Sequence, residues 1–197
     1  VSGMIEKRQI PHAPWYFTHD TAMAISIVET LSRHGRIHQD ELALAFARRY
    51  RQEPDRGYGP FAHEILANID RGGSWRELAP QAFGGSGSFG NGGAMRVAPV
   101  GAYFYDDLND AAEQAAASAE ITHAHAEGKA GAVAIAAAAA LAARAQAGGD
   151  AIKPDHFFSE ILSVTPPSAT RDAIESARDL SPASPPELAA QTLGSGN

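Results

Sequence analysis

Apolar residues recur at helical spacing through most of this chain. In the first such stretch Met23, Ile27 and Leu31 lie four residues apart, and Gly35 follows as a stop signal. We find no stretch in which apolar and polar residues alternate as they do in a half-buried strand. The pattern therefore predicts an all-α fold of compactly packed helices without coiled-coil repeats. The first three helices are expected at 21–34, 40–51 and 61–71.

The middle of the chain carries further helix signals. Pro60 fits the first turn of the third helix, and Ser74 and Glu77 have the spacing of a capping box before a short turn. Pro99 interrupts the apolar stretch 94–105, which predicts a kinked helix there. Asn109 or Asp110 can cap a helix that runs to Thr122.

A long alanine-rich helix is expected over 127–147, closed by Gly148 and Gly149. Its apolar core, Ala130 to Ala143, is shorter than the roughly 20 residues that span a bilayer. We therefore expect a small-residue helix packed inside the protein and no association with a membrane. Weaker helices fill 154–192.

Composition adds limits on class and location. The chain has 197 residues, 44% of them hydrophobic, and we expect one all-α domain. The net charge of −7 argues against general nucleic-acid binding. There is no cysteine, which excludes disulfides, zinc–thiolate sites and cysteine nucleophiles and is typical of a cytoplasmic protein. The chain starts at Val1 and ends on Leu193–Asn197, "LGSGN", so we expect it to be the central portion of a longer domain.

Polar residues gather where the first helix should begin. Thr18, His19, Asp20 and Thr21 are consecutive. Such residues commonly cap a helix, because their oxygens accept hydrogen bonds from free backbone N–H groups. Oxygen-rich side chains at one point are also what Mg²⁺ requires, although this set needs further carboxylates from elsewhere. Both interpretations stay open from the residues alone.

A glycine-rich loop follows the third helix. Six of the ten residues from Gly84 to Gly93 are glycine, and Gly85 to Gly90 matches G-x-G-x-x-G. No strand precedes it and no Gly-Lys-Ser/Thr follows, so the dinucleotide fingerprint and the Walker A motif are both excluded. The loop is either a flexible connector or, through Ser88, Gly90 and Asn91 ahead of a helix, a set of backbone N–H groups that hold an anion.

Histidines flank the start of the alanine-rich helix. His123, His125 and Glu127 are two residues apart. Two imidazoles and one carboxylate are few for a transition-metal site. Histidines that interact with the dipole at the C-terminal end of the preceding helix are the more common case.

These stretches in this order resemble the ADP-ribosylglycohydrolase family. The family's T-D-D-T segment corresponds to Thr18–Thr21, its "GNGAAMR" loop to Ser88–Arg96, and its "TH" to Thr122–His123. The resemblance covers roughly 14–144. It implies an orthogonal multi-helix fold that holds two divalent cations, Mg²⁺ or Mn²⁺. It also implies hydrolysis of the glycosidic bond between ADP-ribose and a protein side chain or small acceptor.

Site residues follow from the same resemblance. Thr18, His19 and Asp20 fall on the N-terminal metal ligands, and Asp20 on a catalytic carboxylate. The segment that holds the diphosphate and ribose corresponds to Ser88, Phe89, Gly90 and Asn91. Met95 supports that segment, and His123 lines the ADP-ribose cleft.

Two departures from the family pattern matter. His19 stands where the family has Asp, and imidazole is a poor ligand for Mg²⁺ but acceptable to Mn²⁺. The family's acidic C-terminal metal segment and its acidic N-terminal loop residue are not within these 197 residues. The alternatives to a hydrolase are a non-catalytic ADP-ribose-binding relative and a purely structural relative.

Overall fold

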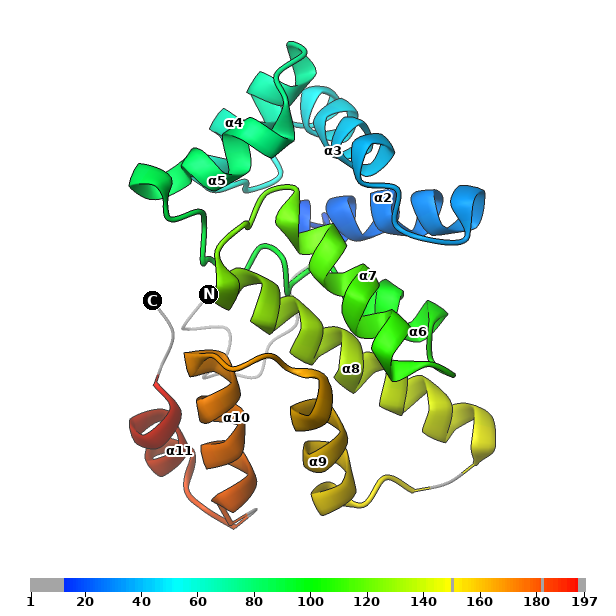
Figure 1. Cartoon of the computed structure of the whole chain (residues 1–197), viewed down its shortest axis with the longest axis vertical. Helices are drawn as coiled ribbons and strands as arrows, with labels where there is room; N and C mark the ends of the chain where they lie inside the picture. Colours follow the sequence, from blue (N-terminus) through cyan, green and yellow to red (C-terminus); the bar gives the residue numbers. More distant parts are fainter. Residues whose placement is uncertain (1–12, 150, 182, 195–197) are drawn as a thin grey trace.

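The computed structural model describes residues 13–149, 151–181 and 183–194. Throughout these residues it contains helices and no strand, which confirms the predicted all-α class. Residues 195–197, the end of the "LGSGN" segment, lie outside the described part. The helices are α2 (His19–His34), α3 (Gln39–Gln52), α4 (Pro60–Asp70), α5 (Trp75–Gly85), α6 (Ala98–Tyr103), α7 (Leu108–Glu120), α8 (Ala126–Gly148), α9 (Pro154–Val164), α10 (Ala169–Asp179) and α11 (Pro186–Leu193), arranged as in Figure 1.

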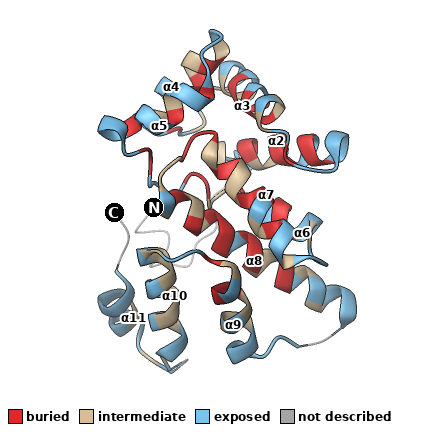
Figure 2. Ribbon diagram, viewed as in Figure 1, coloured by how far each residue is buried: buried red, intermediate tan, exposed pale blue. Residues whose placement is uncertain are grey.

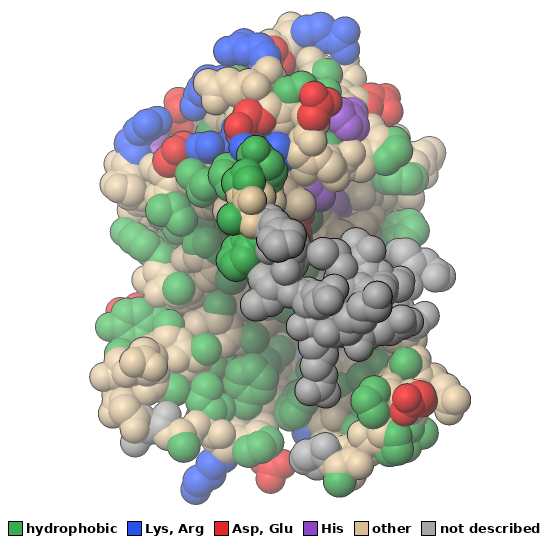
Figure 3. Space-filling model, turned by 180° about the vertical axis from the view of Figure 1, so that it is seen from behind, with side chains coloured by type: hydrophobic (Ala, Val, Ile, Leu, Met, Phe, Trp, Pro, Cys, Tyr) green, Lys and Arg blue, Asp and Glu red, His purple; other side chains and the backbone are tan. Residues whose placement is uncertain are grey.

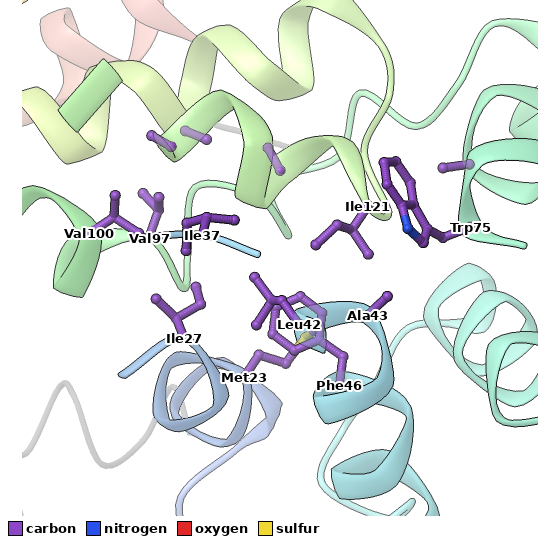
Figure 4. Packing of buried hydrophobic residues seen from close by; sticks show 14 of the residues in the cluster. Met23, Ile27, Ile37, Leu42, Ala43, Phe46, Trp75, Val97, Val100 and Ile121 are labelled. Carbon is purple, nitrogen blue, oxygen red and sulfur yellow. The ribbon is translucent and has the colours of Figure 1, made fainter. Parts of the chain in front are cut away.

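The main core runs through α2–α8. Met23 of α2 points toward Leu42 and Phe46 of α3, and Ile27 of α2 points toward Ile37 and Val97 (Figure 4). Phe46, Leu42 and Ile27 are fully buried. The helical spacing of these residues puts them on one face of each helix, which is why the sequence pattern located α2 and α3 to within two residues.

Helix α8 packs against α6, α7, α9 and α10 and forms the central axis of the molecule (Figure 1). Its alanines allow a close approach of α6: a Cβ at Gly101 would lie 2.0 Å from the Ala136 carbonyl oxygen. Among the described residues α8 alone is long and apolar enough to cross a membrane, but most of one face is buried against its neighbours. The packing is that of a core helix, as the sequence predicted.

Helices α9 and α10 form an outer layer on α8, and α11 packs against α10. Ile161 and Leu162 of α9 are buried in a small second cluster with Leu141. Neither α10 nor α11 has a buried residue, and Figure 2 shows both as half-buried or exposed. The side chain of Glu127, on α8, fixes this layer by accepting hydrogen bonds from the backbone N–H groups of Ala169 and Thr170 at the start of α10 (2.7 and 3.0 Å). These hydrogen bonds hold the pKa of Glu127 below its usual value against the opposing effect of burial.

Several helix ends differ from the predictions. Asp107 caps α7 through Oδ1, which accepts from the N–H groups of Asn109 and Asp110, so neither of the predicted caps is correct. Ser74 stands at the N-cap of α5 but makes no side-chain cap hydrogen bond. The predicted short turn is the helical segment Trp75–Gly85, whose backbone leaves the helical conformation at Ala82, Phe83 and Gly84. Helix α7 ends at Glu120, short of Thr122.

The predicted kinked helix at 94–105 was wrong. Only Ala98–Tyr103 is helical, and turns occupy the residues before it. Pro99 lies in the first turn of α6, where its missing N–H costs no hydrogen bond, so it starts a helix instead of bending one. The glycine loop therefore does not lead directly into a helix.

Candidate functional site

A cavity of about 480 Å³ lies between segments that are far apart in the sequence. The start of α2, the residues around the start of α4, the glycine loop and the connection between α7 and α8 form its wall. Six of the residues predicted for the site line it: His19, Ser88, Gly90, Asn91, Met95 and His123. The fold thus brings together the stretches that the sequence identified separately.

The glycine loop is pressed against the α7–α8 connection. A Cβ at Gly92 would lie 2.4 Å from His123 Cε1. A Cβ at Gly87 would lie 2.7 Å from the backbone nitrogen of His125. Gly128, in the first turn of α8, could not carry a Cβ either, because it would lie 2.8 Å from the Ser88 carbonyl oxygen. Real Cβ atoms do not approach other atoms this closely, so the glycines here serve close packing. The loop is a packed wall of the cavity, which excludes the flexible-connector interpretation.

Backbone donors of this loop remain available to a ligand. The Gly90 N–H donates to Ser88 Oγ (3.3 Å), which shapes the loop. The backbone N–H groups of Phe89, Asn91 and Gly92 donate to no acceptor within residues 13–149, 151–181 and 183–194. Closely spaced free N–H groups of this kind are suited to binding an anion.

Arg96 lies fully buried behind the loop. One guanidinium nitrogen, Nη2, donates to the Ser118 carbonyl oxygen and to Thr122 Oγ1, both at 2.9 Å. The guanidinium carbon lies 4.4 Å from the centre of the Phe46 ring. Burial lowers the pKa of Arg96 to about 9, and no carboxylate of the described residues pairs with it. Sequence reasoning did not single out Arg96, because nothing in the sequence distinguishes a buried arginine from a solvated one.

Thr122 connects Arg96 to His123. Thr122 Oγ1 lies 2.7 Å from His123 Nδ1 and accepts a hydrogen bond from Arg96. Burial, with the nearby Arg96 charge as the second cause, lowers the pKa of His123 to about 3. His123 is therefore a neutral imidazole at physiological pH. The prediction that the histidines cap the C-terminal end of α7 was wrong for His125, whose Nδ1 accepts from the Glu127 N–H at the N-terminus of α8.

The charge inside the cavity is opposite to that of the chain. The net charge is −7, yet no Asp or Glu of the described residues lines the cavity, whereas Arg96 does. Figure 3 shows that Lys, Arg, Asp and Glu side chains gather instead at the end of the molecule that α3, α4 and α5 form. A cavity that excludes carboxylates and contains a buried cation favours an anionic ligand.

Aromatic side chains form a row at the cavity mouth. The ring centres of Phe61 and Phe83 lie 5.2 Å apart, those of Phe83 and Phe89 lie 6.2 Å apart, and Phe89 lies 5.6 Å from His125. Phe83 and Phe89 are both largely exposed. Phe83 has a φ of 52°, which is uncommon for a bulky residue and breaks α5 at this point. Phe61 and Phe83 line the cavity, but Phe89 does not.

The predicted metal ligands lie at the first turn of α2. Helix α2 begins at His19, two residues earlier than predicted, and Thr18 takes the N-cap position without a side-chain cap hydrogen bond. His19 faces the cavity, and its Nδ1 is buried without a hydrogen-bond partner, 3.2 Å from Asp20 Oδ1. Thr18 and Asp20 are outside the cavity wall. The loop 53–59 fixes this end of α2 through two hydrogen bonds of Arg56. The Arg56 carbonyl oxygen accepts from the His19 N–H, and the Arg56 guanidinium donates to the Phe17 carbonyl oxygen.

These ligands do not by themselves fit two cations. Thr18, His19 and Asp20 offer a hydroxyl, an imidazole and one carboxylate, which fall short of the oxygen-rich octahedral set that Mg²⁺ prefers. Nowhere in the described part of the chain do three or more His, Asp or Glu side chains gather as a metal site. The orphaned His19 Nδ1 is the one feature here that suits a softer ion such as Mn²⁺.

The geometry thus defines an all-α protein with a cavity suited to an anionic, partly aromatic ligand. Comparison with known proteins is consistent with that class. The sequence model of the ADP-ribosylglycohydrolase family matches residues 1–197, and the chain belongs to this family. It is 38% identical over 111 residues to ADP-ribosylhydrolase ARH3 of Homo sapiens, a match that covers 55% of this chain and 30% of that protein. The corresponding proteins of Gallus gallus and Mus musculus are 36% and 37% identical, again over 30% of their length.

Proposed function

We propose that the protein is a hydrolase that removes ADP-ribose from a modified protein side chain or a small acceptor. Water would attack the anomeric carbon of the ribose, the N- or O-glycosidic bond would break, and a proton would pass to the departing nitrogen or oxygen. ADP-ribose would be the product. Membership of the ADP-ribosylglycohydrolase family and similarity to ADP-ribosylhydrolases support this proposal.

The single observation that carries the proposal is the charge reversal at the cavity. An acidic chain would repel a diphosphate unless its binding site excluded carboxylates, and this cavity has none among its lining residues. The free N–H groups of Phe89, Asn91 and Gly92 supply donors for phosphate oxygens without a basic side chain at the surface. The loop segment Ser88–Gly92 is therefore proposed to hold the diphosphate and the neighbouring ribose: Phe89, Asn91 and Gly92 supply free N–H groups, the hydrogen bond between Gly90 and Ser88 shapes the loop, and Met95 supports it.

The aromatic row supports a nucleotide ligand in particular. A purine ring has two apolar faces, and stacking on Phe and similar side chains stabilises it in water. Phe83 and Phe89 present exposed rings next to the loop, so the adenine of ADP-ribose is proposed to stack there. This gives Phe89 a role that does not require it to line the cavity.

Metal dependence belongs to the proposal as well. Two divalent cations, Mg²⁺ or Mn²⁺, are proposed near Thr18, His19 and Asp20, with further ligands from outside the described residues. If bound there, such ions would supply charge stabilisation during bond cleavage. Asp20 lies outside the cavity wall, so its carboxylate is proposed to act as a ligand of these ions.

The direct test of the hydrolase is release of ADP-ribose from ADP-ribosylated peptides, with arginine-linked and serine-linked acceptors compared, in the presence of Mg²⁺ or Mn²⁺. Turnover with either ion supports the proposal. Binding of ADP-ribose without any turnover would identify a non-catalytic binding relative instead. The absence of both would leave a structural relative.

A second test concerns His19. Replacement of the imidazole by a carboxylate in His19→Asp adds an oxygen ligand and a negative charge, so we expect Mg²⁺ affinity to rise. Isothermal titration with MgCl₂ measures this directly. The matched control is His156→Asp, an exposed histidine on α9, at which no gain is expected. An unchanged Mg²⁺ affinity in His19→Asp would show that the start of α2 does not bind the ion.

A further inference from the structure

The hydrogen-bond chain from Arg96 through Thr122 to His123 determines which imidazole nitrogen carries the proton. An arginine only donates, so Thr122 Oγ1 accepts from Arg96 Nη2. The threonine hydroxyl has one hydrogen left to donate. Its neighbour is His123 Nδ1 at 2.7 Å, and within the described residues it has no other acceptor.

The opposite assignment leaves a hydrogen without a partner. If Nδ1 carried the proton, Thr122 would accept twice, and its own hydroxyl hydrogen would be buried unpaired. Thr122 is 3% exposed, so water does not readily supply the missing acceptor. An unpaired buried donor is unfavourable, because it loses its hydrogen bond to water and gains none in the protein. Protonation of both ring nitrogens would also place an imidazolium beside the buried charge of Arg96, whose guanidinium has no carboxylate partner in the described ranges.

The remaining nitrogen of His123 faces the glycine loop. Nε2 lies 2.7 Å from the position of a Cβ on Gly92 and 3.6 Å from that on Gly90. Thr122, His123, Gly90 and Gly92 all line the cavity. No hydrogen-bond acceptor for Nε2 occurs in the part of the chain that the structure describes.

We propose that Arg96 and Thr122 are positioning residues that hold His123 in its neutral Nε2–H tautomer, with Nε2–H as a fixed hydrogen-bond donor to an oxygen of the bound ligand. His123 then binds ligand without exchanging a proton with it, because Nε2 already carries hydrogen and Nδ1 is occupied by Thr122. The tautomer is a property of the protein alone. Only the identity of the ligand as ADP-ribose rests on the proposed function.

The experiment combines nitrogen NMR with binding. In the ¹⁵N-histidine-labelled full chain at neutral pH, we expect His123 Nε2 to resonate as a protonated nitrogen and Nδ1 as an unprotonated, hydrogen-bond-accepting one. In Thr122→Val the Nδ1 resonance should move toward that of a free imidazole nitrogen, and ADP-ribose should bind about three- to tenfold more weakly. Thr122→Ser, which keeps the hydroxyl, should restore both values.

Thr165→Val is the matched control, because Thr165 is also buried and hydrogen-bonded but lies away from the cavity. It should change neither the His123 resonances nor ADP-ribose affinity. A protonated Nδ1 in the wild type, or a Thr122→Val variant with unchanged resonances and affinity, would overturn the inference. If the wild type shows the expected tautomer but binds no ADP-ribose, the proposed function fails and the positioning roles of Arg96 and Thr122 stand.

Discussion

The body formed by α2–α8 and the outer layer formed by α9–α11 differ in how they are held together. The body buries Phe46, Leu42 and a complete arginine side chain, and its helices approach so closely that glycine is required at Gly101. The outer layer buries only Ile161 and Leu162 of α9 and Thr165 at its C-cap among the described residues, and it is joined to α8 partly through the carboxylate of Glu127. The cavity lies entirely in the body. The close packing of the body therefore fixes the site, and the outer layer is expected to affect stability more than binding.

Truncation of a buried side chain should reveal the largest difference in stability between the two regions. Phe46→Ala removes a fully buried ring and its contact with the Arg96 guanidinium, so we expect a loss of about 3–5 kcal/mol in the free energy of unfolding. Leu188→Ala on exposed α11 should change it by less than about 0.5 kcal/mol. Urea denaturation measures both, and similar losses would contradict the comparison.

A single methyl group tests the close approach of α6 to α8. In Gly101→Ala the new Cβ would meet the Ala136 carbonyl oxygen, and we expect a loss of about 1–3 kcal/mol in the free energy of unfolding. Gly131→Ala, on α8, meets only the Ala94 Cβ at 3.7 Å and should be neutral or stabilise the helix by up to about 1 kcal/mol. Thermal melts of the two variants distinguish these outcomes, and tolerance of Gly101→Ala would refute the tight contact.

Acid should destabilise the body through His123. Its pKa is 6.5 when unfolded and about 3 when folded, so below pH 6.5 the unfolded state binds the proton first and the free energy of unfolding falls with falling pH. Between pH 6.5 and about 5 the fall should reach about 1–2 kcal/mol. The carboxylates with lowered pKa, Asp40, Glu53 and Glu127, lose their contributions only as pH drops toward and below their ordinary values of 3.8 and 4.5.

Denaturant titrations at several pH values measure this slope. His123→Gln should flatten it between pH 6.5 and about 5, whereas His156→Gln, at an exposed position, should leave it intact. A slope that survives in His123→Gln would show that another group carries the pH dependence.

The smallest effect is expected at the junction of the two regions. Glu127→Ala removes the acceptor for the first N–H groups of α10, which should cost about 1 kcal/mol, in the range of a lost helix cap. Hydrogen exchange should become faster in α10 and stay unchanged in α2 and α3. Faster exchange throughout the body would mean that the outer layer is required for the core.

Sequence periodicity was sufficient for the helices whose ends carry strong local signals. Gly35 ends α2 with a φ of 69°, and Gly149 ends α8 with a φ of 74°, both as predicted from glycine alone. Local pattern failed at Pro99, because a proline can start a helix as well as kink one, and at Asp107, because neighbouring Asp and Asn residues are equally good caps by composition. The motifs located six cavity residues, but Arg96 and Thr122 become informative only through contacts with His123 and Ser118, which spacing along the chain cannot reveal.

The central claim is that the packed glycine loop of the body binds ADP-ribose. Isothermal titration of the full chain with ADP-ribose, compared between the wild type and Asn91→Ala, tests it most directly. We predict saturable binding by the wild type that weakens about tenfold when the Asn91 side chain is removed, since that side chain either contacts the ligand or fixes the loop. Absence of heat in the wild type, or an affinity that Asn91→Ala leaves unchanged, would contradict the account.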